Sequence, residues 1–204
     1  KRSGILFRNG HGTMTACQIY SNNGAGIDVR ESATPLIRDC DIYSNVEAGI
    51  RILQDGNPHV LRSKIRNGLG VGIHVSDKGQ GKIKACEIFA NTKAGIEITS
   101  NGHPLIQACQ IHDGQASGIL VEQGQGKIEE CEIFGNAEAG IRLRQRANPL
   151  IWRSKIYQNQ AEGCYIYENA KGTLKECHIF ANAYAAIKIS QHANPRIRHC
   201  HIYK

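Results

Sequence analysis

The sequence of 204 residues contains no long apolar run, no secretion signal and no block of like charge. No stretch approaches the ~18 consecutive apolar residues of a membrane-spanning helix, so we expect no membrane partner. The first ten residues, KRSGILFRNG, lack the apolar segment and small-residue cleavage site of a signal peptide. The net charge of +7 would suit an acidic partner. Because Lys and Arg are spread along the whole chain, we expect no nucleic acid partner.

A Gly-Ile dipeptide, or a close variant of it, recurs nine times at intervals of 22 or 23 residues. The nine units are aligned on Gly4, Gly26, Gly49, Gly72, Gly95, Gly118, Gly140, Gly163 and Ala186. Fixed periods of this length are typical of solenoid proteins, in which each repeat buries its apolar side against its neighbours. We therefore expect a single domain over residues 1–204. Because both ends fall inside patterned sequence, we expect the chain to be a fragment of a longer protein.

Four columns of the aligned repeats are apolar in every unit, and isoleucine dominates them. One column contains Ile19, Ile42, Ile65, Ile88, Ile111, Ile133, Ile156, Ile179 and Ile202. Two other columns lie two residues apart, which is the side-chain period of a strand, and branched residues suit a pleated sheet. The predicted fold class is therefore all-β: a right-handed parallel β-helix of about nine 22–23-residue coils, its hand taken from the general preference of parallel crossovers.

A leucine-rich repeat is the main rival fold, because its period overlaps with this one. Leucine is scarce in the sequence, however, and isoleucine dominates the apolar columns. The Gly, Pro and Asn corners also leave no stretch long enough for the helix of such a repeat. These observations favour the β-helix.

Three further columns repeat one kind of side chain, and the first two of them, the cysteine and aromatic columns, predict ladders of stacked side chains. The cysteine column contains Cys17, Cys40, Cys86, Cys109, Cys131, Cys177 and Cys200, with Ser63 and Ser154 in its two gaps. The aromatic column contains Tyr20, Tyr43, Phe89, Phe134, Tyr157, Phe180 and Tyr203. The asparagine column contains Asn22, Asn45, Asn91, Asn136, Asn159 and Asn182. Gly fills its remaining positions, and we expect left-handed backbone there because Asn and Gly best tolerate a positive φ.

The cysteine column favours buried, unreactive thiols over a disulfide framework, because a large stacked core needs no covalent staples. Neighbouring coils would still bring Cys17 and Cys40 within the distance range of a disulfide. Unpaired buried thiols favour a reducing intracellular compartment. His178 and His201 share a column, but no CxxC or HxxxH spacing supplies further ligands, so we predict no metal site and no cofactor.

One outward face of the predicted β-helix carries the candidate binding residues. They are Glu97, Glu122, Arg142, Arg144, Tyr165 and Tyr167. Carboxylates, guanidinium groups and phenols within three or four coils are typical of a surface that contacts sugars or peptides. The plain alternative is an exposed sheet on which opposite charges pair with each other. For an enzyme, Glu97 and Glu122 would be the catalytic pair, because strand geometry places them roughly 8 Å apart, as in inverting glycosidases.

The repeats resemble the parallel β-helix repeats of the NosD and carbohydrate-binding and sugar-hydrolase type, and their wording is closest to the repeat region of F-box only protein 11 and its relatives. The resemblance covers essentially all nine units. It rests on the alternation of a Gly-x-Gly coil, as in Gly124 to Ile141, with an Asn-Pro coil, as in Ala147 to Asn159. It implies the β-helix fold, with either a role in recruiting protein substrates or an activity on sugars. Members of this family commonly place Asn in the buried corner ladder, where this sequence has Cys.

Together these observations favour a non-catalytic β-solenoid module that presents an extended surface to a protein or glycan partner. The units vary in length by one residue, so none carries the long insertions with which solenoid enzymes build a cleft. The alternative is a polysaccharide-active enzyme of the pectate-lyase-like type, either a glycoside hydrolase or a lyase, or a fragment of one. We also expect end-to-end self-association, because the terminal coils have no neighbour to cover them.

Overall fold

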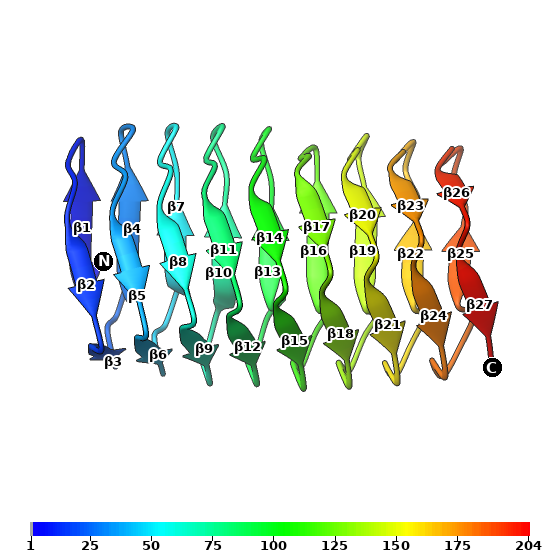
Figure 1. Cartoon of the computed structure of the whole chain (residues 1–204), viewed down its shortest axis with the longest axis horizontal. Coiled ribbons are helices and arrows are strands. Elements are labelled where there is room, and N and C mark those ends of the chain that lie inside the picture. Colours follow the sequence, from blue (N-terminus) through cyan, green and yellow to red (C-terminus); the bar gives the residue numbers. More distant parts are fainter. Residues whose placement is uncertain (1) are drawn as a thin grey trace.

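In the computed structural model, which describes residues 2–204, nine coils stack along one axis and each coil contributes one strand to each of three parallel sheets (Figure 1). Sheet A contains β1 (Ile5–Arg8), β4 (Ile27–Arg30), β7 (Ala48–Ile52), β10 (Val71–Val75), β13 (Ile96–Ile98), β16 (Ile119–Glu122), β19 (Ile141–Arg144), β22 (Cys164–Ile166) and β25 (Ile187–Ile189). Sheet B contains β2 (Thr13–Thr15), β5 (Leu36–Arg38), β8 (His59–Leu61), β11 (Lys82–Lys84), β14 (Leu105–Gln107), β17 (Lys127–Glu129), β20 (Leu150–Trp152), β23 (Thr173–Lys175) and β26 (Arg196–Arg198). Sheet C contains β3 (Gln18–Tyr20), β6 (Asp41–Tyr43), β9 (Lys64–Arg66), β12 (Glu87–Phe89), β15 (Gln110–His112), β18 (Glu132–Phe134), β21 (Lys155–Tyr157), β24 (His178–Phe180) and β27 (His201–Tyr203).

This architecture confirms the predicted nine-coil parallel β-helix. Residues 2–204 contain no helix that could cross a bilayer. The longest strands have five residues, and each coil turns through three short corners.

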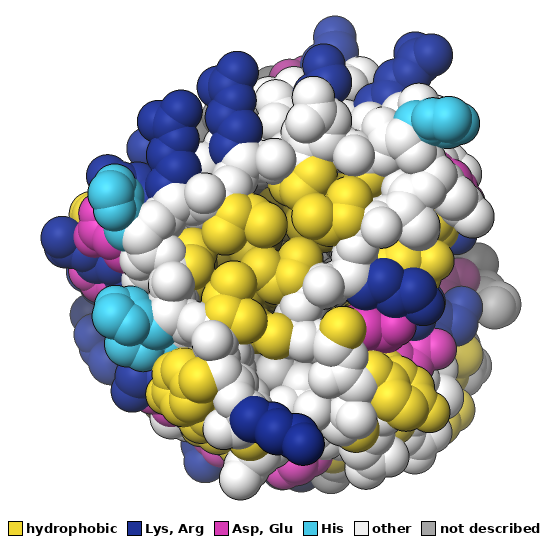
Figure 2. All heavy atoms as spheres, turned by 90° about the vertical axis from the view of Figure 1, so that its right-hand side faces the viewer, with side chains coloured by type: hydrophobic (Ala, Val, Ile, Leu, Met, Phe, Trp, Pro, Cys, Tyr) yellow, Lys and Arg dark blue, Asp and Glu magenta, His cyan; other side chains and the backbone are white. Residues whose placement is uncertain are grey.

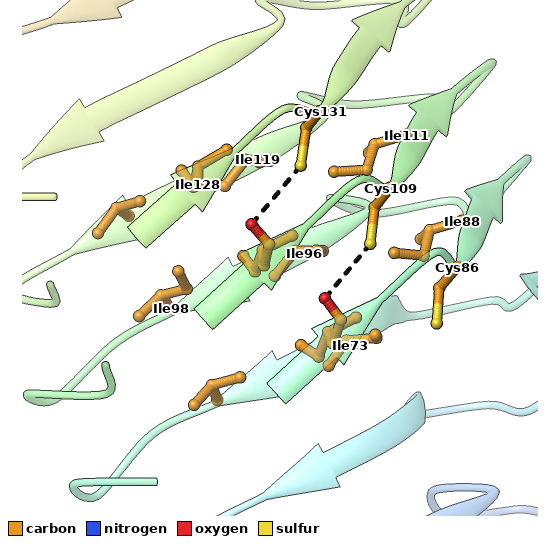
Figure 3. Packing of buried hydrophobic residues seen from close by; sticks show 14 of the residues in the cluster. Ile73, Cys86, Ile88, Ile96, Ile98, Cys109, Ile111, Ile119, Ile128 and Cys131 are labelled. Atoms are coloured by element: carbon orange, nitrogen blue, oxygen red, sulfur yellow. Dashed lines mark hydrogen bonds between the residues drawn. The ribbon is translucent and has the colours of Figure 1, made fainter. Parts of the chain in front are cut away.

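The interior is a stack of isoleucine, because each strand pairs in register with its counterpart in the next coil. Ile42 pairs with Ile65, and Ile65 pairs with Ile88. All three side chains are fully buried. Figure 3 shows how such columns from sheets A and C meet in the core. The predicted apolar columns therefore form one continuous core.

The repeated glycine before the first strand of each coil is required by the close approach of neighbouring coils. A Cβ atom at Gly95 would lie 2.8 Å from the carbonyl oxygen of Gly118 and 2.7 Å from Cγ2 of Ile111. Neither atom can move without disturbing the sheets. Close packing at the corner that leads from sheet C into sheet A thus requires the glycine of the Gly-Ile dipeptide.

The expectation of left-handed backbone in the asparagine column is wrong. Positive φ occurs one residue earlier, at Ser44 (54°) and Ala90 (53°), where the chain leaves sheet C. Asn45 and Asn91 follow these residues, and their side chains are buried. The asparagine is used for its side chain, not for its tolerance of a positive φ.

The asparagine side chains form a hydrogen-bonded ladder inside this corner. Nδ2 of Asn136 donates to the carbonyl oxygens of Ile111 (3.3 Å) and Phe134 (3.1 Å) and to Oδ1 of Asn159 (3.0 Å). Oδ1 of Asn136 accepts from the backbone N–H of Gly114 (3.2 Å). Backbone groups that the turn removes from the sheets thereby find partners. The chain therefore has a buried asparagine ladder as well as a cysteine ladder. The inference from the sequence that Cys takes the place of the family's buried asparagine is also wrong.

The cysteine ladder occupies the corner between sheets B and C, and all eight cysteines of the chain are free thiols. Sγ of Cys109 donates to the carbonyl oxygens of Gln107 (3.3 Å) and Ile83 (3.5 Å). Burial raises the pKa of Cys177 to about 11. A thiol with such a pKa is protonated near neutral pH and is a poor nucleophile, as expected for the ladder. Cys131 differs, because a hydrogen bond with the side chain of Cys109 lowers its pKa.

The aromatic column stacks ring on ring along the outside of sheet C, as predicted. The rings of Phe134 and Tyr157 have centroids 5.1 Å apart, and those of Tyr157 and Phe180 are 5.0 Å apart. The guanidinium of Arg66 continues the ladder over the ring of Tyr43 at 4.5 Å. Because the ring faces cover one another, they are not available to stack on a ligand.

The C-terminal end of the β-helix leaves the core uncovered (Figure 2). Ile189 is 47% exposed, Ile197 is 40% exposed and Ile202 is 49% exposed. Their counterparts in the preceding coil, Ile166, Leu174 and Ile179, are fully buried. The expected end-to-end association of coils through this surface stays a prediction.

We expect Asn136→Ala to lower the free energy of unfolding by about 1–3 kcal/mol, because two buried carbonyls and one buried N–H lose a partner. Urea denaturation with an unchanged m-value would measure the loss. Gln110→Ala, on the exposed side of the preceding strand of sheet C, is the matched control and should stay within about 0.5 kcal/mol of the parent. Equal effects of the two substitutions would contradict a structural role for the ladder.

Candidate functional site

The six predicted site residues lie on the outer face of sheet A, and we call this surface the sheet A patch. It consists of Glu97 on β13, Glu122 at the end of β16, Arg142 and Arg144 on β19, Tyr165 on β22, and Tyr167 just beyond it. Each of these side chains is half-buried. The patch therefore spans four neighbouring strands, as the repeat predicted.

Ion pairs hold both arginines of the patch. Nη2 of Arg144 lies 2.6 Å from Oε2 of Glu122, and its Nε also donates to this oxygen (2.9 Å). Nη2 of Arg142 lies 3.2 Å from Oε2 of Glu138, which precedes β19 by three residues. Glu97, in contrast, forms no ion pair among residues 2–204 and stands opposite Leu120 of β16. The two glutamates proposed as a catalytic pair thus have different surroundings.

The two tyrosines form a stacked pair beside these charges. The ring centroids of Tyr165 and Tyr167 are 4.4 Å apart, with an angle of 20° between the planes. Nζ of Lys188 lies 4.4 Å from the centroid of Tyr165. Oγ of Ser190 donates to the phenol oxygen of Tyr165 at 3.4 Å. The pair is held firmly at the C-terminal side of the patch.

A notch that the sequence analysis missed adjoins the patch, at the corner between sheets A and B. It has a volume of about 580 Å³, which is within the range of small-ligand sites. It is lined by Asn101, Gln123, Gly124, Gln125, Gln145, Arg146, Glu168 and Asn169. Three of these residues, Gln123, Gln145 and Glu168, directly follow patch residues in the chain. Patch and notch are therefore continuous.

The notch exists because one coil has a shorter corner than its neighbours. The flanking coils carry two successive residues with positive φ there, Ser100 with Asn101 and Gln145 with Arg146. The coil of β16 and β17 has only Gln123, which is followed by Gly124. In Figure 1 the loop that joins β16 to β17 accordingly stops short of the loops on either side. The only signal in the sequence is the 22-residue interval between Gly118 and Gly140.

The lining of the notch offers hydrogen-bonding groups of every kind. Five primary amides, one guanidinium and one carboxylate supply both donors and acceptors. Nε2 of Gln123 donates to Oε1 of Gln145 at 3.2 Å. Among residues 2–204, neither Arg146 nor Glu168 has an ion-pair partner. The notch therefore presents a guanidinium and a carboxylate without ion pairs in the described part of the chain, unlike most of the charged groups of sheet A.

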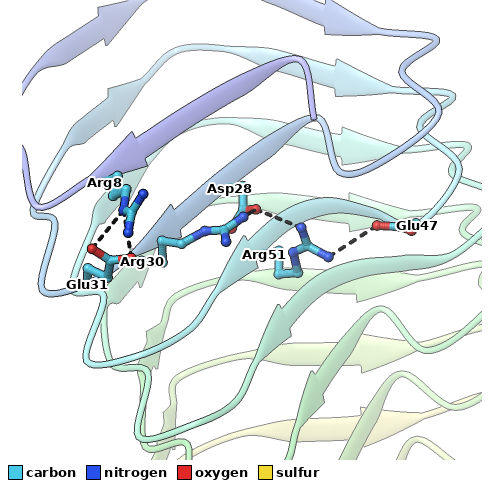
Figure 4. Close-up of polar contacts among 6 residues, drawn as sticks. All are labelled: Arg8, Asp28, Arg30, Glu31, Glu47 and Arg51. Carbon is cyan, nitrogen blue, oxygen red and sulfur yellow. Dashed lines mark hydrogen bonds and ion pairs between the residues drawn. The ribbon is translucent and has the colours of Figure 1, made fainter. Parts of the chain in front are cut away.

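The charges of a second cluster on sheet A are paired within the cluster (Figure 4). Asp28 is fully buried, although it lies on the outward side of β4. Its Oδ2 pairs with Arg30 and with Nη2 of Arg51, the latter at 2.6 Å. Nη1 of Arg51 also lies 3.1 Å from Oε2 of Glu47. These groups neutralise one another, so we do not include them in the candidate site.

The described part of the chain, residues 2–204, contains no group of three or more His, Cys, Asp or Glu side chains suited to a metal ion. His178 and His201 do lie side by side on sheet C, with ring centroids 4.7 Å apart. They stack as part of the column.

His74 on β10 links the charged cluster to the patch, because it lies between Arg51 and Glu97 in the register of sheet A. Burial is the largest cause that lowers the pKa of its imidazole. Below about pH 6.5 the unfolded chain therefore binds a proton that the folded chain resists.

We expect the free energy of unfolding to decrease as the pH falls below about 6.5, and the decrease to be smaller in His74→Gln. Urea denaturation of both proteins between pH 5 and pH 8 would measure the difference. Parallel curves for the two proteins would show that His74 has the same pKa in the folded and unfolded states.

The sequence and the fold were both compared with those of known proteins, and the sequence identifies the family. Residues 3–143 and 101–204 both match the family described as the right handed beta helix region. No curated protein matches the chain in sequence. In structure, the chain is similar to the periplasmic alginate epimerase AlgG, with a TM-score of 0.75 and 10% identity over 90% of this chain and 50% of that one.

Two further solved structures share the fold. One is pectate lyase Pel9A, with a TM-score of 0.61 and 12% identity over 86% of this chain and 55% of that one. The other is the A-module of the mannuronan C-5 epimerase AlgE4 of Azotobacter vinelandii, with a TM-score of 0.58 and 13% identity over 94% of this chain and 59% of that one. The chain thus spans about half the length of these proteins, and identities this low show the fold alone. Since the two sequence matches together cover residues 3–204, this chain belongs to the right-handed β-helix family.

Proposed function

We propose that the chain binds a polysaccharide through the sheet A patch and the adjoining notch. The notch is the observation that carries the proposal, because its amides, Arg146 and Glu168 are a concave set of polar groups without strong partners of their own. Sugar rings present many hydroxyl groups, which need donors and acceptors together. The stacked rings of Tyr165 and Tyr167 add an aromatic surface beside them.

The composition of the patch supports a glycan over a tightly bound protein partner. The large hydrophobic residues that the β-helix exposes include Leu6, Leu69 and Tyr184. Within residues 2–204, no exposed large hydrophobic residue lies in the patch. Stable protein interfaces usually centre on exposed apolar anchors. The patch is also elongated along the axis, where coils follow one another at ~4.8 Å, so a linear polymer could contact several coils in succession.

The structural neighbours support the same class of ligand. Their names describe an alginate epimerase, a pectate lyase and a mannuronan epimerase, all of which act on polysaccharides. The likeness is distant, and it is the agreement between these names and the polar notch that favours a polysaccharide.

We expect insertion of one Asn between Gln123 and Gly124 to weaken glycan binding by roughly tenfold, which corresponds to ~1.4 kcal/mol. The insertion restores the longer corner of the neighbouring coils and so fills the notch. Binding would be located on a glycan array and then measured by calorimetry. The matched control is the same insertion between Asn9 and Gly10, in the other coil with a shortened corner.

Unchanged binding by the first insertion variant would contradict the role of the notch. A glycan array without signal for the parent protein would contradict the proposal itself and favour a protein partner. Circular dichroism and thermal unfolding of both variants would establish that each still folds.

A polysaccharide-active enzyme is the second candidate function, and the three structural neighbours favour it. In that case Glu97 and Glu122 are the acid–base candidates on sheet A. We expect Glu97→Gln or Glu122→Gln to lower turnover of alginate or pectate by roughly 100-fold or more. Glu132→Gln, which removes a paired carboxylate from sheet C, is the control. Absence of turnover by the parent protein on a panel of polysaccharides would contradict the enzyme and leave the binding function.

A further inference from the structure

The three sheets differ in whether their outward cations have carboxylate partners. On sheet C every outward cation does: Lys64 with Glu87 (3.3 Å), Arg66 with Asp41 (2.8 Å) and Lys155 with Glu132 (2.9 Å). On sheet A the same holds for Arg8, Arg30, Arg51, Arg142, Arg144 and Lys188. The outward Lys and Arg residues of these two faces therefore each have a carboxylate partner.

Sheet B is different, because its outward positions carry seven Lys or Arg residues against one carboxylate, Glu129. The seven are Arg38, Lys82, Lys84, Lys127, Lys175, Arg196 and Arg198. Most of the net charge of +7 is thus gathered on one sheet, although Lys and Arg are spread evenly along the chain.

Four of these cations, Lys82, Lys84, Arg196 and Arg198, form no ion pair with any residue in the range 2–204. The other three have only long contacts or shared partners. Nζ of Lys127 is 4.0 Å from Oε1 of Glu129.

Glu176 shows how few carboxylates serve this face. It accepts from Nε of Arg153 (2.8 Å) and Nε1 of Trp152 (3.2 Å), and it pairs with Nζ of Lys175 (3.2 Å). The hydrogen bond from Arg153 is the largest cause that lowers the pKa of Glu176 to about 2. One carboxylate is thus shared among three donors, and the face keeps an excess of positive charge.

We propose that the outer face of sheet B binds a linear acidic polysaccharide that lies along the axis of the β-helix. This inference goes beyond the proposed function, because it concerns a different sheet and different residues. The outward cations lie in two columns whose positions recur at ~4.8 Å, so the acidic groups of an extended polymer can meet them one after another. The strands from β11 to β26 cover five such spacings, or about 24 Å.

The apolar residues among the cations favour a polysaccharide over a nucleic acid. Leu36, Leu61, Leu105 and Leu150 are half-buried on this face and suit the apolar faces of sugar rings. Single-stranded nucleic acids need exposed aromatic platforms, but the only outward aromatic residue of sheet B is Trp152, and the guanidinium of Arg153 lies over its ring at 4.3 Å. A duplex needs an element that enters a groove, and the short strands of sheet B provide none.

A hollow at the edge of sheet B is an independent observation in favour of this proposal. It has a volume of about 300 Å³ and is lined by Asn148, Lys171, Gly172, Thr173, Asn194 and Arg196. Two cations, two amides and a hydroxyl therefore converge on one small concavity. A sugar carboxylate there could accept charge-assisted hydrogen bonds from Lys171 and Arg196, and neighbouring hydroxyl groups could bond to the amides.

The test is binding of an oligogalacturonate to the parent protein and to K82Q/K84Q/R196Q. The control variant, K64Q/R66Q/K155Q, removes the same charge from sheet C. We expect the sheet B variant to bind roughly tenfold more weakly or worse, and the control to bind within about twofold of the parent. Binding by the parent should weaken as salt is added, and the sheet B variant should show a smaller salt dependence. A neutral dextran should not bind.

Several outcomes would overturn the proposal. They are equal losses in the two triple variants, equal binding of dextran, and tighter binding of duplex DNA or of anionic lipid vesicles than of oligogalacturonate. The Asn insertion after Gln123 separates this proposal from the proposed function, because it alters the notch and leaves the cations of sheet B in place. Retained oligogalacturonate binding by that variant supports the sheet B surface, and loss of it would assign the acidic polymer to the notch.

Discussion

The in-register stacking of coils is the constraint on which every other feature of this molecule depends. The backbone N–H of Ile73 donates to the carbonyl oxygen of Gly95 in the next coil. The N–H of Ile96 donates to the carbonyl oxygen of Gly118 one coil further on. Each coil is thereby held about one strand spacing from its neighbours, so any residue lies beside its counterpart 22 or 23 positions away. A repeated isoleucine then becomes a core, and a repeated asparagine, cysteine or tyrosine becomes a ladder.

The same constraint explains why a one-residue deletion produces a notch and not a slipped sheet. Glu122 still pairs with Arg144 before the shortened corner, and Lys127 still pairs with Leu150 after it. A slip of one residue would turn the core-facing side chains of every following strand outward. The deletion is therefore absorbed where the chain leaves sheet A, and it opens a concave space between two coils with longer corners.

The repeat predicts from the sequence whatever depends on one column alone. The core position of Ile65 and the stacking of Tyr157 on Phe180 follow from period and polarity, and the structure confirms both. Features that depend on two columns at once, or on the backbone conformation of one corner, could not be predicted. Positive φ is adopted by Ser44 and Ala90 and not by the asparagines after them, because the tight corner imposes it on whichever residue follows the strand. The notch was missed for a related reason, since a 22-residue interval does not say which corner is shortened.

Charge on the three faces is the clearest case of information that only the fold supplies. In a parallel sheet the nearest partners of a side chain belong to the coils before and after it, so pairing depends on residues about 23 positions apart. Lys64 meets Glu87 in this way, whereas Lys82 lies between His59 and Leu105. The chain has 18 Asp and Glu residues, but only one of them lies at an outward position of sheet B. Uncompensated like charges on one face repel each other, and four of the seven outward cations of sheet B form no ion pair within residues 2–204, whereas the outward Lys and Arg residues of sheets A and C do. This contrast is the physical basis of the proposal that an external polyanion covers sheet B.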